Sequence, residues 1–220
     1  MNKAVIFDLD GTLIDSLGDI HAALNDVLQF RNAPPLALAT VRGLIGKGSA
    51  NLVRRALTAQ NLAIDEASCA AALADFLRLY SAESAKLTTI FDGAIDALDR
   101  LRDGGFCLGI CTNKPLAPTK IVLDQFGLTR FFDTIVGGDQ LASRKPDPAM
   151  LFHAMACLGT TSCLFVGDSE IDRETAAAAG QPFALFTKGY RTSSIEILNP
   201  EYYFNEYSEL TNIVNLNIRN

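Results

Sequence analysis

The feature that most constrains the fold of this chain is an apolar run that ends abruptly in two carboxylates. Residues 4–7 are apolar and strand-forming, and Asp8 and Asp10 follow at once, with Gly11 and Thr12 directly after them. Such a run is typical of a strand buried in a parallel sheet. Ligands of parallel sheets bind outside the carboxyl ends of the strands, so the two carboxylates stand where a cation and a substrate are expected. Desolvating them is costly unless positive charge meets them.

Length and charge narrow the classes of protein that fit. The chain has 220 residues, of which 49% are hydrophobic and 20% are charged, enough apolar material for one large domain or one domain with an insertion. The net charge of −6 makes a broad nucleic-acid-binding surface a poor expectation, so we predict no nucleic-acid partner. Phosphate binding through a few local cations stays open.

Location and redox state are also predicted from the sequence. We find no apolar stretch long enough to span a bilayer and no signal-peptide pattern ahead of the first strand, so we expect a cytoplasmic protein with no membrane partner. The five cysteines are odd in number and form no C-x-x-C pair, which predicts neither a disulfide framework nor a zinc site.

Strands and helices alternate through most of the chain. Apolar runs predict strands over residues 3–7, 106–112, 132–137, 163–166 and 183–186. Helical patterns lie between or beside them, over residues 91–102, 118–126, 148–158 and 171–179. This alternation predicts an α/β fold, a doubly wound parallel sheet with helices on both faces.

The segment after the first strand breaks that alternation. Residues 16–86 contain almost only helical patterns, including a helix over 16–30 with Ser16 as its N-cap and an Ala-rich helix over 65–86. The simplest interpretation is an all-helical domain of residues 15–89, inserted into an α/β core domain of residues 1–14 and 90–220. At the end of the chain we expect an edge strand over 202–204 and a short helix over 208–214, without a functional signal.

Polar side chains follow several of the expected strands. Besides the first strand's carboxylates they are Thr112 and Asn113, then Lys145, and then Asp168, Ser169 and Asp172. In a parallel sheet all of them converge on one edge. Clustered carboxylates repel one another by about 4 kcal/mol per close pair at an effective dielectric near 20, so they need a cation. An all-oxygen ligand set favours Mg²⁺, and with Lys145 and the polar donors beside it the edge is suited to a phosphoryl group.

These residues carry a family resemblance. The start of the chain, the Thr112-Asn113 pair, Lys145 and the Asp168 to Asp172 segment resemble, in order, the four motifs of the haloacid-dehalogenase-type phosphohydrolases. The resemblance covers the α/β part of the chain, and the helical insertion is similar to the C1-type cap of that superfamily. Residues 112–115, 137–139, 145–146 and 189–190, with cap residues 41–48 and 55–57, also resemble the phosphoglycolate phosphatase subfamily. Related sugar-phosphate phosphatases and pyrophosphatases share much of this second pattern.

The resemblance implies a role for each residue. Asp8 would be the nucleophile that forms an aspartyl-phosphate, and Asp10 the general acid and then the general base. Asp8, the Asp10 backbone carbonyl and Asp168 would hold Mg²⁺. Lys145 would neutralise the phosphoryl oxygens and the nucleophile.

The remaining residues would support these groups. Thr112 and Asn113 would bind the phosphoryl group together with Gly11 and Thr12, with plain helix capping as the alternative for the first two. Asp172 and Ser169 would support the site from behind the metal ligands. For Asp172 an ordinary carboxylate at a helix start is the alternative.

Asp10 also guides the choice of reaction. Dehalogenases and phosphonate-cleaving members of the superfamily lack Asp at that position, so its presence favours phosphoryl transfer. We expect a Mg²⁺-dependent phosphomonoester hydrolase acting on a small phosphorylated metabolite, with 2-phosphoglycolate as first choice, working as a monomer or homodimer. The alternatives are a sugar-phosphate phosphatase, an inorganic pyrophosphatase and a β-phosphoglucomutase-like enzyme. A non-catalytic metabolite-binding protein is the alternative from another class.

Overall fold

The chain divides into two compact units. The computed structural model describes residues 3–82 and 85–217. Unit 1 consists of Met1–Asp15 and Ile90–Asn220, and unit 2 is the intervening segment Ser16–Thr89. Each unit has its own buried apolar side chains, so each is described by itself.

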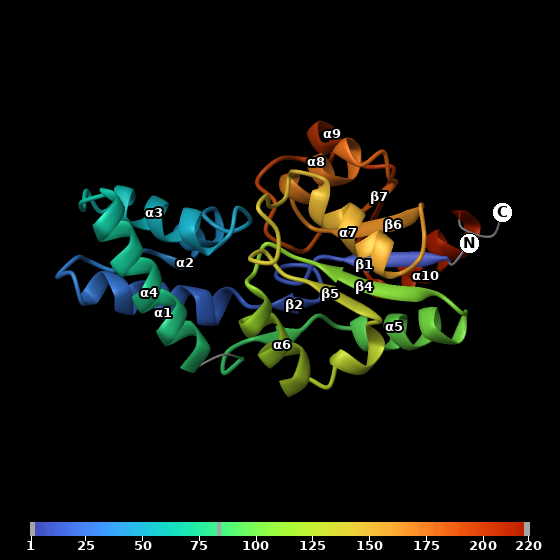
Figure 1. Cartoon of the computed structure of the whole chain (residues 1–220), viewed down its shortest axis with the longest axis horizontal. Helices are drawn as coiled ribbons and strands as arrows, with labels where there is room; N and C mark the ends of the chain where they lie inside the picture. The colour runs from blue at the N-terminus through green and yellow to red at the C-terminus, as the bar shows by residue number, and fades with distance from the viewer. Residues whose placement is uncertain (1–2, 83–84, 218–220) are drawn as a thin grey trace. The chain divides into compact units, whose positions relative to one another are not determined.

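Unit 1 is built on a six-stranded sheet in which all neighbouring strands are parallel (Figure 1). Its strand order is β5-β4-β1-β6-β7-β8. The strands are β1 (Ala4–Phe7), β4 (Cys107–Cys111), β5 (Thr134–Val136), β6 (Cys163–Gly167), β7 (Phe183–Phe186) and β8 (Tyr202–Phe204). The expected doubly wound parallel sheet is therefore confirmed, including the edge strand near the end of the chain.

Strand β1 lies in the middle of this sheet and is buried on both faces. All four of its side chains, Ala4 to Phe7, have 0% exposure. Its last residue, Phe7, pairs with Ile110 of β4 on one side and Val166 of β6 on the other. Burial on both faces explains why the strand is a continuous apolar run rather than an alternating one. The register also brings the ends of β1, β4 and β6 to the same level.

Helices cover both faces of the sheet (Figure 1). Those of unit 1 are α5 (Ala94–Asp103), α6 (Leu116–Gln125), α7 (Ala149–Cys157), α8 (Glu170–Ala178), α9 (Ile195–Leu198) and α10 (Tyr207–Asn217), with the 3₁₀-helix η1 (Thr129–Phe131). Helix α7 packs on β4 and β5 while α8 packs on β6 and β7. Helix α10 packs against α5 and β8, which ties the end of the chain to the sheet.

Unit 2 is helical. It contains α1 (Leu17–Gln29), α2 (Leu38–Arg42), α3 (Ser49–Ala59) and α4 (Glu66–Ala82), and α4 packs against both α1 and α3. The helix expected over 65–86 ends at Ala82 as described, and its residues 83–84 lie outside the described part of the chain. Ser16 occupies the N-cap position of α1, but its side chain makes no capping hydrogen bond. Its backbone, with ψ of 5°, lacks the extended conformation that directs an N-cap hydroxyl at the helix.

A second, smaller sheet lies outside the six-stranded one. Strands β2 (Ile14–Asp15) and β3 (Thr89–Ile90) pair with each other in a small two-stranded sheet.

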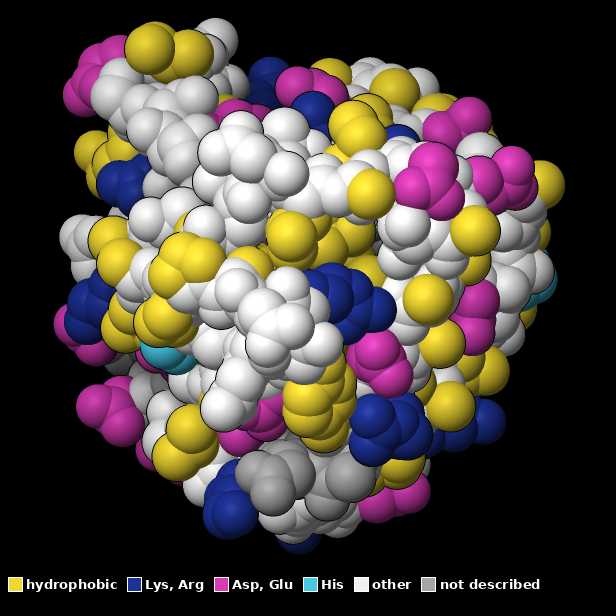
Figure 2. Space-filling model, turned by 90° about the vertical axis from the view of Figure 1, so that its left-hand side faces the viewer, with side chains coloured by type: hydrophobic (Ala, Val, Ile, Leu, Met, Phe, Trp, Pro, Cys, Tyr) yellow, Lys and Arg dark blue, Asp and Glu magenta, His cyan; other side chains and the backbone are white. Residues whose placement is uncertain are grey.

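Within residues 3–82 and 85–217 no helix combines the length and apolar character needed to cross a membrane. On the face drawn in Figure 2, Lys and Arg side chains lie among Asp and Glu rather than in one patch.

The Asp19 carboxylate closes unit 2 by joining its first helix to its last segment. Asp19, on α1, is only 5% exposed. It accepts hydrogen bonds from the Leu87 backbone N–H at 2.9 Å, the Thr88 backbone N–H at 2.9 Å and the Thr88 hydroxyl at 2.5 Å. One buried carboxylate thus accepts from three donors of Leu87 and Thr88, which belong to no helix or strand.

We expect Asp19→Ala to lower the free energy of unfolding by about 2–3 kcal/mol, because it leaves two backbone N–H groups and a hydroxyl without their acceptor. Urea unfolding followed by far-UV circular dichroism measures the change. The matched control is Asp26→Ala, which removes an exposed carboxylate from the same helix. Equal unfolding midpoints for the two variants would contradict the structural role of Asp19.

Candidate active site

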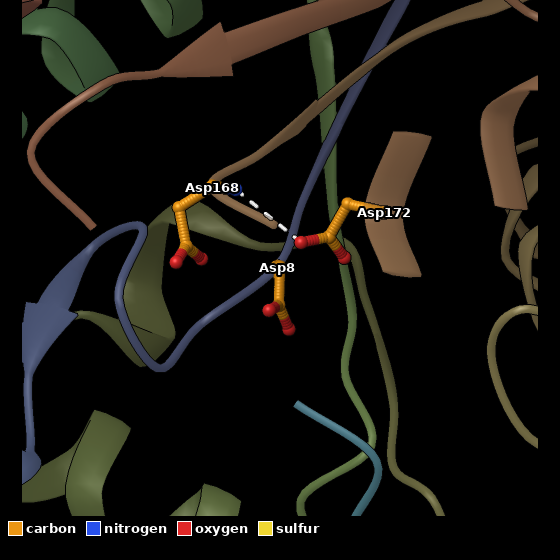
Figure 3. Close-up of side chains that lie close together, drawn as sticks. All are labelled: Asp8, Asp168 and Asp172. Carbon is orange, nitrogen blue, oxygen red and sulfur yellow. Dashed lines mark hydrogen bonds between the residues drawn. The ribbon is translucent and has the colours of Figure 1, made fainter. Parts of the chain in front are cut away.

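Three carboxylates meet where β1 and β6 end. Asp8 follows β1, Asp168 follows β6, and Asp172 lies in the first turn of α8 (Figure 3). Each contributes a carboxylate oxygen to a group within which all three oxygens lie within 4.8 Å of one another. The backbone N–H of Asp8 donates to Val166 O at 2.9 Å, so the ladder between the two strands continues into the site. Parallel pairing alone therefore brings Asp8 and Asp168 together across 160 residues of sequence.

Lys145 supplies positive charge to this cluster. Its ammonium lies 2.6 Å from Asp172 Oδ1 and 2.9 Å from Asp8 Oδ1, and its side chain is only 2% exposed. The Lys145 backbone is held by Asn113, whose amide group donates to Lys145 O and whose Oδ1 accepts from Lys145 N–H, both at 3.0 Å. The end of β4 thus fixes the point from which the lysine reaches the carboxylates.

Asp172 is engaged on both of its oxygens. Oδ1 pairs with Lys145, and Oδ2 accepts from the Ser169 hydroxyl at 2.6 Å, the Ser169 N–H at 3.1 Å and the Asp168 N–H at 3.3 Å (Figure 3). Together with the bond from Asp172 N–H to Ser169 Oγ, this forms a capping box that starts α8. Asp172 therefore orients Lys145 and caps the helix at once.

Asp168 is held by two other segments. Its Oδ1 accepts from the Thr12 hydroxyl at 2.9 Å, and its Oδ2 accepts from the Tyr190 backbone N–H at 2.6 Å. This close approach requires glycine at two positions, because a Cβ on Gly189 would lie 2.4 Å, and one on Gly11 2.5 Å, from Asp168 Oδ2. Gly11 also has a φ of +87°, which favours glycine.

Asp10 lies apart from the carboxylate cluster and has a lysine of its own. Lys114 Nζ is 2.9 Å from Asp10 Oδ1 and 3.2 Å from Oδ2, so the ammonium contacts both oxygens. The Lys114 side chain is 4% exposed and the Asp10 side chain is 14% exposed. The two carboxylates that follow β1 thus face different partners, Asp8 toward Lys145 and Asp10 toward Lys114.

Burial and charge shift the ionisation of the cluster. Burial raises the pKa of Asp8 to about 6, against the opposing effect of Lys145 and with a further rise from Asp172. Burial also raises the pKa of Asp168 well above its ordinary value, and the charges of Asp172 and Asp8 add to this. Burial alone would lower the pKa of Lys145, but Asp172 and Asp8 outweigh it and the pKa lies above its ordinary value. The site thus has more negative charge than Lys145 alone balances.

The donor set fits a hard divalent cation. Asp8 Oδ1 is buried and accepts no hydrogen bond, since the Lys145 ammonium is at ion-pair distance but not in hydrogen-bonding geometry. Asp8 and Asp168 offer carboxylate oxygens, the type of ligand that Mg²⁺ prefers. Asp172 belongs to the same cluster, but its Oδ1 already pairs with the positive charge of Lys145, whereas Asp168 accepts from two neutral donors, the Thr12 hydroxyl and the Tyr190 N–H. Asp8 and Asp168 are therefore the side chains suited to hold the metal.

The other residues expected at the site all lie close by. Thr112 is buried, and its hydroxyl accepts from the Lys114 N–H at 3.3 Å. The Gly11 and Thr12 N–H groups donate to Ile14 O and Leu9 O in the turn after β1. Asn113 is engaged by the Lys145 backbone, so its visible contribution is to position that lysine. Binding of a phosphoryl group by these four residues stays a prediction.

Two residues of the site received no role from the sequence. Lys114 directly follows the Thr112-Asn113 pair, and its signals in the sequence were its position after a strand and its place in the subfamily pattern of residues 112–115. Tyr190 contributes a backbone N–H to Asp168, and its hydroxyl donates to Asp15 Oδ1 at 2.8 Å. A backbone donor 22 residues away in sequence carries no residue-type signal.

Comparison with known proteins agrees with this geometry. The model of the family described as haloacid dehalogenase-like hydrolase matches residues 5–186. A phosphoglycolate phosphatase of Cereibacter sphaeroides is 44% identical over 210 residues, which cover 96% of each chain. A phosphoglycolate phosphatase of Rhodobacter capsulatus is 41% identical over 214 residues, which cover 97% of each chain.

Solved structures extend the likeness to the fold. The crystal structure of a predicted phosphoglycolate phosphatase from Haemophilus somnus superposes with a TM-score of 0.89 at 28% identity, covering 96% of this chain and 97% of that one. The parallel sheet with helices on both faces places the chain in the α/β fold class, with three carboxylates clustered where β1 and β6 end. The chain belongs to the haloacid dehalogenase-like hydrolases, and it is a phosphatase of that family. Phosphatases of this family generally use a divalent metal ion.

The raised pKa of Asp8 has a consequence for stability in the absence of metal. The pKa of Asp8 in the folded state is about 6, above the ordinary 3.8, so ionising this carboxylate lowers the free energy of unfolding. The loss is complete above about pH 6 and absent below pH 3.8. Asn resembles the neutral carboxyl group. In chelator at about pH 8 we expect Asp8→Asn to raise the free energy of unfolding by about 1–3 kcal/mol.

Thermal unfolding with chelator at about pH 8 and about pH 4 measures this gain, which should shrink at the lower pH. Asp99→Asn, which changes an exposed carboxylate on α5, is the control for loss of a surface charge. A gain that is the same at both pH values would show that the burial of the Asp8 charge is not its cause.

Proposed function

We propose that this phosphatase hydrolyses a small, acidic phosphomonoester in a Mg²⁺-dependent reaction, and that 2-phosphoglycolate, giving glycolate and phosphate, is its substrate. The observation that carries the proposal is the pair of carboxylates after β1, of which Asp8 faces Lys145 and Asp10 faces Lys114. The substrate rests on the names of the relatives from Cereibacter sphaeroides and Rhodobacter capsulatus. Residence in the cytoplasm and a monomeric or dimeric state stay predictions.

In the first step of the proposed reaction, Asp8 is the nucleophile. One of its carboxylate oxygens attacks phosphorus and forms an aspartyl-phosphate while the bond from phosphorus to the ester oxygen breaks. Asp10 gives a proton to the departing alkoxide. Lys145, at 2.9 Å from Asp8, balances charge on the nucleophile and on the phosphoryl oxygens. Mg²⁺, bound by Asp8, Asp168 and the Asp10 carbonyl, would neutralise the phosphoryl oxygens further.

The second step regenerates the enzyme. Asp10, now lacking its proton, accepts one from a water molecule whose oxygen attacks phosphorus. The bond between phosphorus and the Asp8 oxygen breaks, which releases phosphate and restores the carboxylate. Lys145 and Asp172 keep the nucleophile in place between the two steps.

A panel of phosphate esters tests the reaction and the substrate together. We expect phosphate release that requires Mg²⁺, stops in chelator and is fastest with 2-phosphoglycolate among sugar phosphates, pyrophosphate and nucleoside monophosphates. Metal-dependent release that is fastest from another compound would keep the chemistry and replace the substrate. Absence of release from every compound would point to a mutase or to a protein that only binds its metabolite.

Two variants test the covalent mechanism. Asp8→Asn should lower kcat by about a thousandfold or more, because the amide cannot attack phosphorus. Asp10→Asn should slow both steps, so intact mass spectrometry after mixing with substrate should detect a chain heavier by one phosphoryl group. Turnover by Asp8→Asn at a rate near that of the wild type would contradict the aspartyl-phosphate. The circular dichroism spectrum of each variant checks that the fold is retained.

A further inference from the structure

The site contains a second buried ammonium that the proposed steps leave without a task. Lys114 Nζ contacts Asp10 Oδ1 at 2.9 Å and Oδ2 at 3.2 Å, and its side chain is 4% exposed. Lys145 serves the nucleophile on the other side of the site and contacts two carboxylates, Asp8 and Asp172. Lys114 therefore stands on the side of the site where Asp10 meets the leaving group.

The backbone of Lys114 is fixed by the turn in which it lies. Its carbonyl accepts from Gly138 N–H at 2.9 Å, and its N–H donates to Thr112 Oγ1 at 3.3 Å. The Gly138 backbone presses so closely on this turn that a Cβ there would lie 2.3 Å from Asn113 O. The flexible four-carbon stem of lysine extends from this rigid base. Rotation about the bonds of this stem would let the ammonium turn from Asp10 to a neighbouring anion without any change in the loop.

The contact with Asp10 conflicts with the work assigned to that residue. Both oxygens of Asp10 are turned toward Lys114, whereas proton transfer requires one of them at the oxygen of the leaving group. When Asp10 turns to the substrate, its contact with the Lys114 ammonium is broken. Breaking a contact between two buried charges is costly. A negative group on the departing part of the substrate would offset that cost by taking the place of the Asp10 carboxylate.

We propose that Lys114 binds the anionic group of the substrate's alcohol part, exchanging Asp10 for it, and that it thereby selects phosphomonoesters whose leaving group is itself negatively charged. The inference rests on the proposed function, and Lys114 would be the residue that binds the carboxylate of a 2-phosphoglycolate-like substrate. A neutral alcohol of the same size would leave Lys114 on Asp10 and so would keep Asp10 from the leaving group.

Two substrates that differ only in that group test the proposal. 2-Phosphoglycolate ends in a carboxylate, and 2-hydroxyethyl phosphate ends in a neutral hydroxyl in its place. The quantity to measure is the ratio of their kcat/KM values in wild type and Lys114→Met. Any general damage to Asp10 lowers both values and cancels in the ratio. The lost charge-assisted contact should lower the ratio by about ten- to a hundredfold.

Two further variants complete the series. Lys114→Arg keeps the positive charge and should retain most of the preference for the carboxylate. Lys120→Met removes an exposed lysine from α6, six residues away, and should leave the ratio as in wild type. Circular dichroism of the Met variant checks that it is folded.

The outcomes separate this inference from the proposed function. A lower ratio in Lys114→Met alone supports the proposal. An equal loss with both substrates would overturn it and leave Lys114 as a residue that only positions Asp10. A wild-type ratio near one would instead reject the acidic substrate, and absence of hydrolysis of these two compounds and of the rest of the panel would reject the phosphomonoesterase reaction itself.

Discussion

The ammonium of Lys145, buried between the carboxylates of Asp8 and Asp172, is the contact on which the rest of the site depends. Without it, three carboxylates, each with an oxygen within 4.8 Å of the other two, would repel one another without the ammonium that now lies between Asp8 and Asp172. Its effect also extends outward, because Asp172 starts α8 and Asn113 fixes the Lys145 backbone to the end of β4. The sheet, a helix and a loop are thus joined through one charged group, and the net negative charge that remains suits a divalent cation.

Much of the fold could be predicted because burial determines the composition of its strands. A strand such as β1, covered on both faces, must be apolar throughout, so its run is visible in the sequence. The two-residue strands β2 and β3 escaped prediction, since pairing of so short a segment leaves no period to recognise. The cap position of Ser16 was identified correctly, but its hydrogen bond depends on a backbone angle that residue type does not determine.

The site was predictable to the extent that the sheet topology determines it. Carboxylates after β1 and β6 must be neighbours once those strands pair, so Asp8 and Asp168 meet as the sequence led us to expect. Pairing of Lys114 with Asp10 depends instead on how a long side chain lies across two loops. The same holds for the two hydrogen bonds between the amide of Asn113 and the backbone of Lys145, while binding of a phosphoryl group by Asn113 stays a prediction.

The pairing of β2 with β3 gives the chain a modular character. The backbone leaves unit 1 at Asp15 and returns at Ile90, and these two crossings run side by side in one small sheet. A segment whose ends are adjacent can be shortened, lengthened or exchanged at little cost in loop closure, and without altering the register of the large sheet. Unit 2 can therefore diverge in sequence and size while the edge of the sheet that carries the carboxylates stays unchanged.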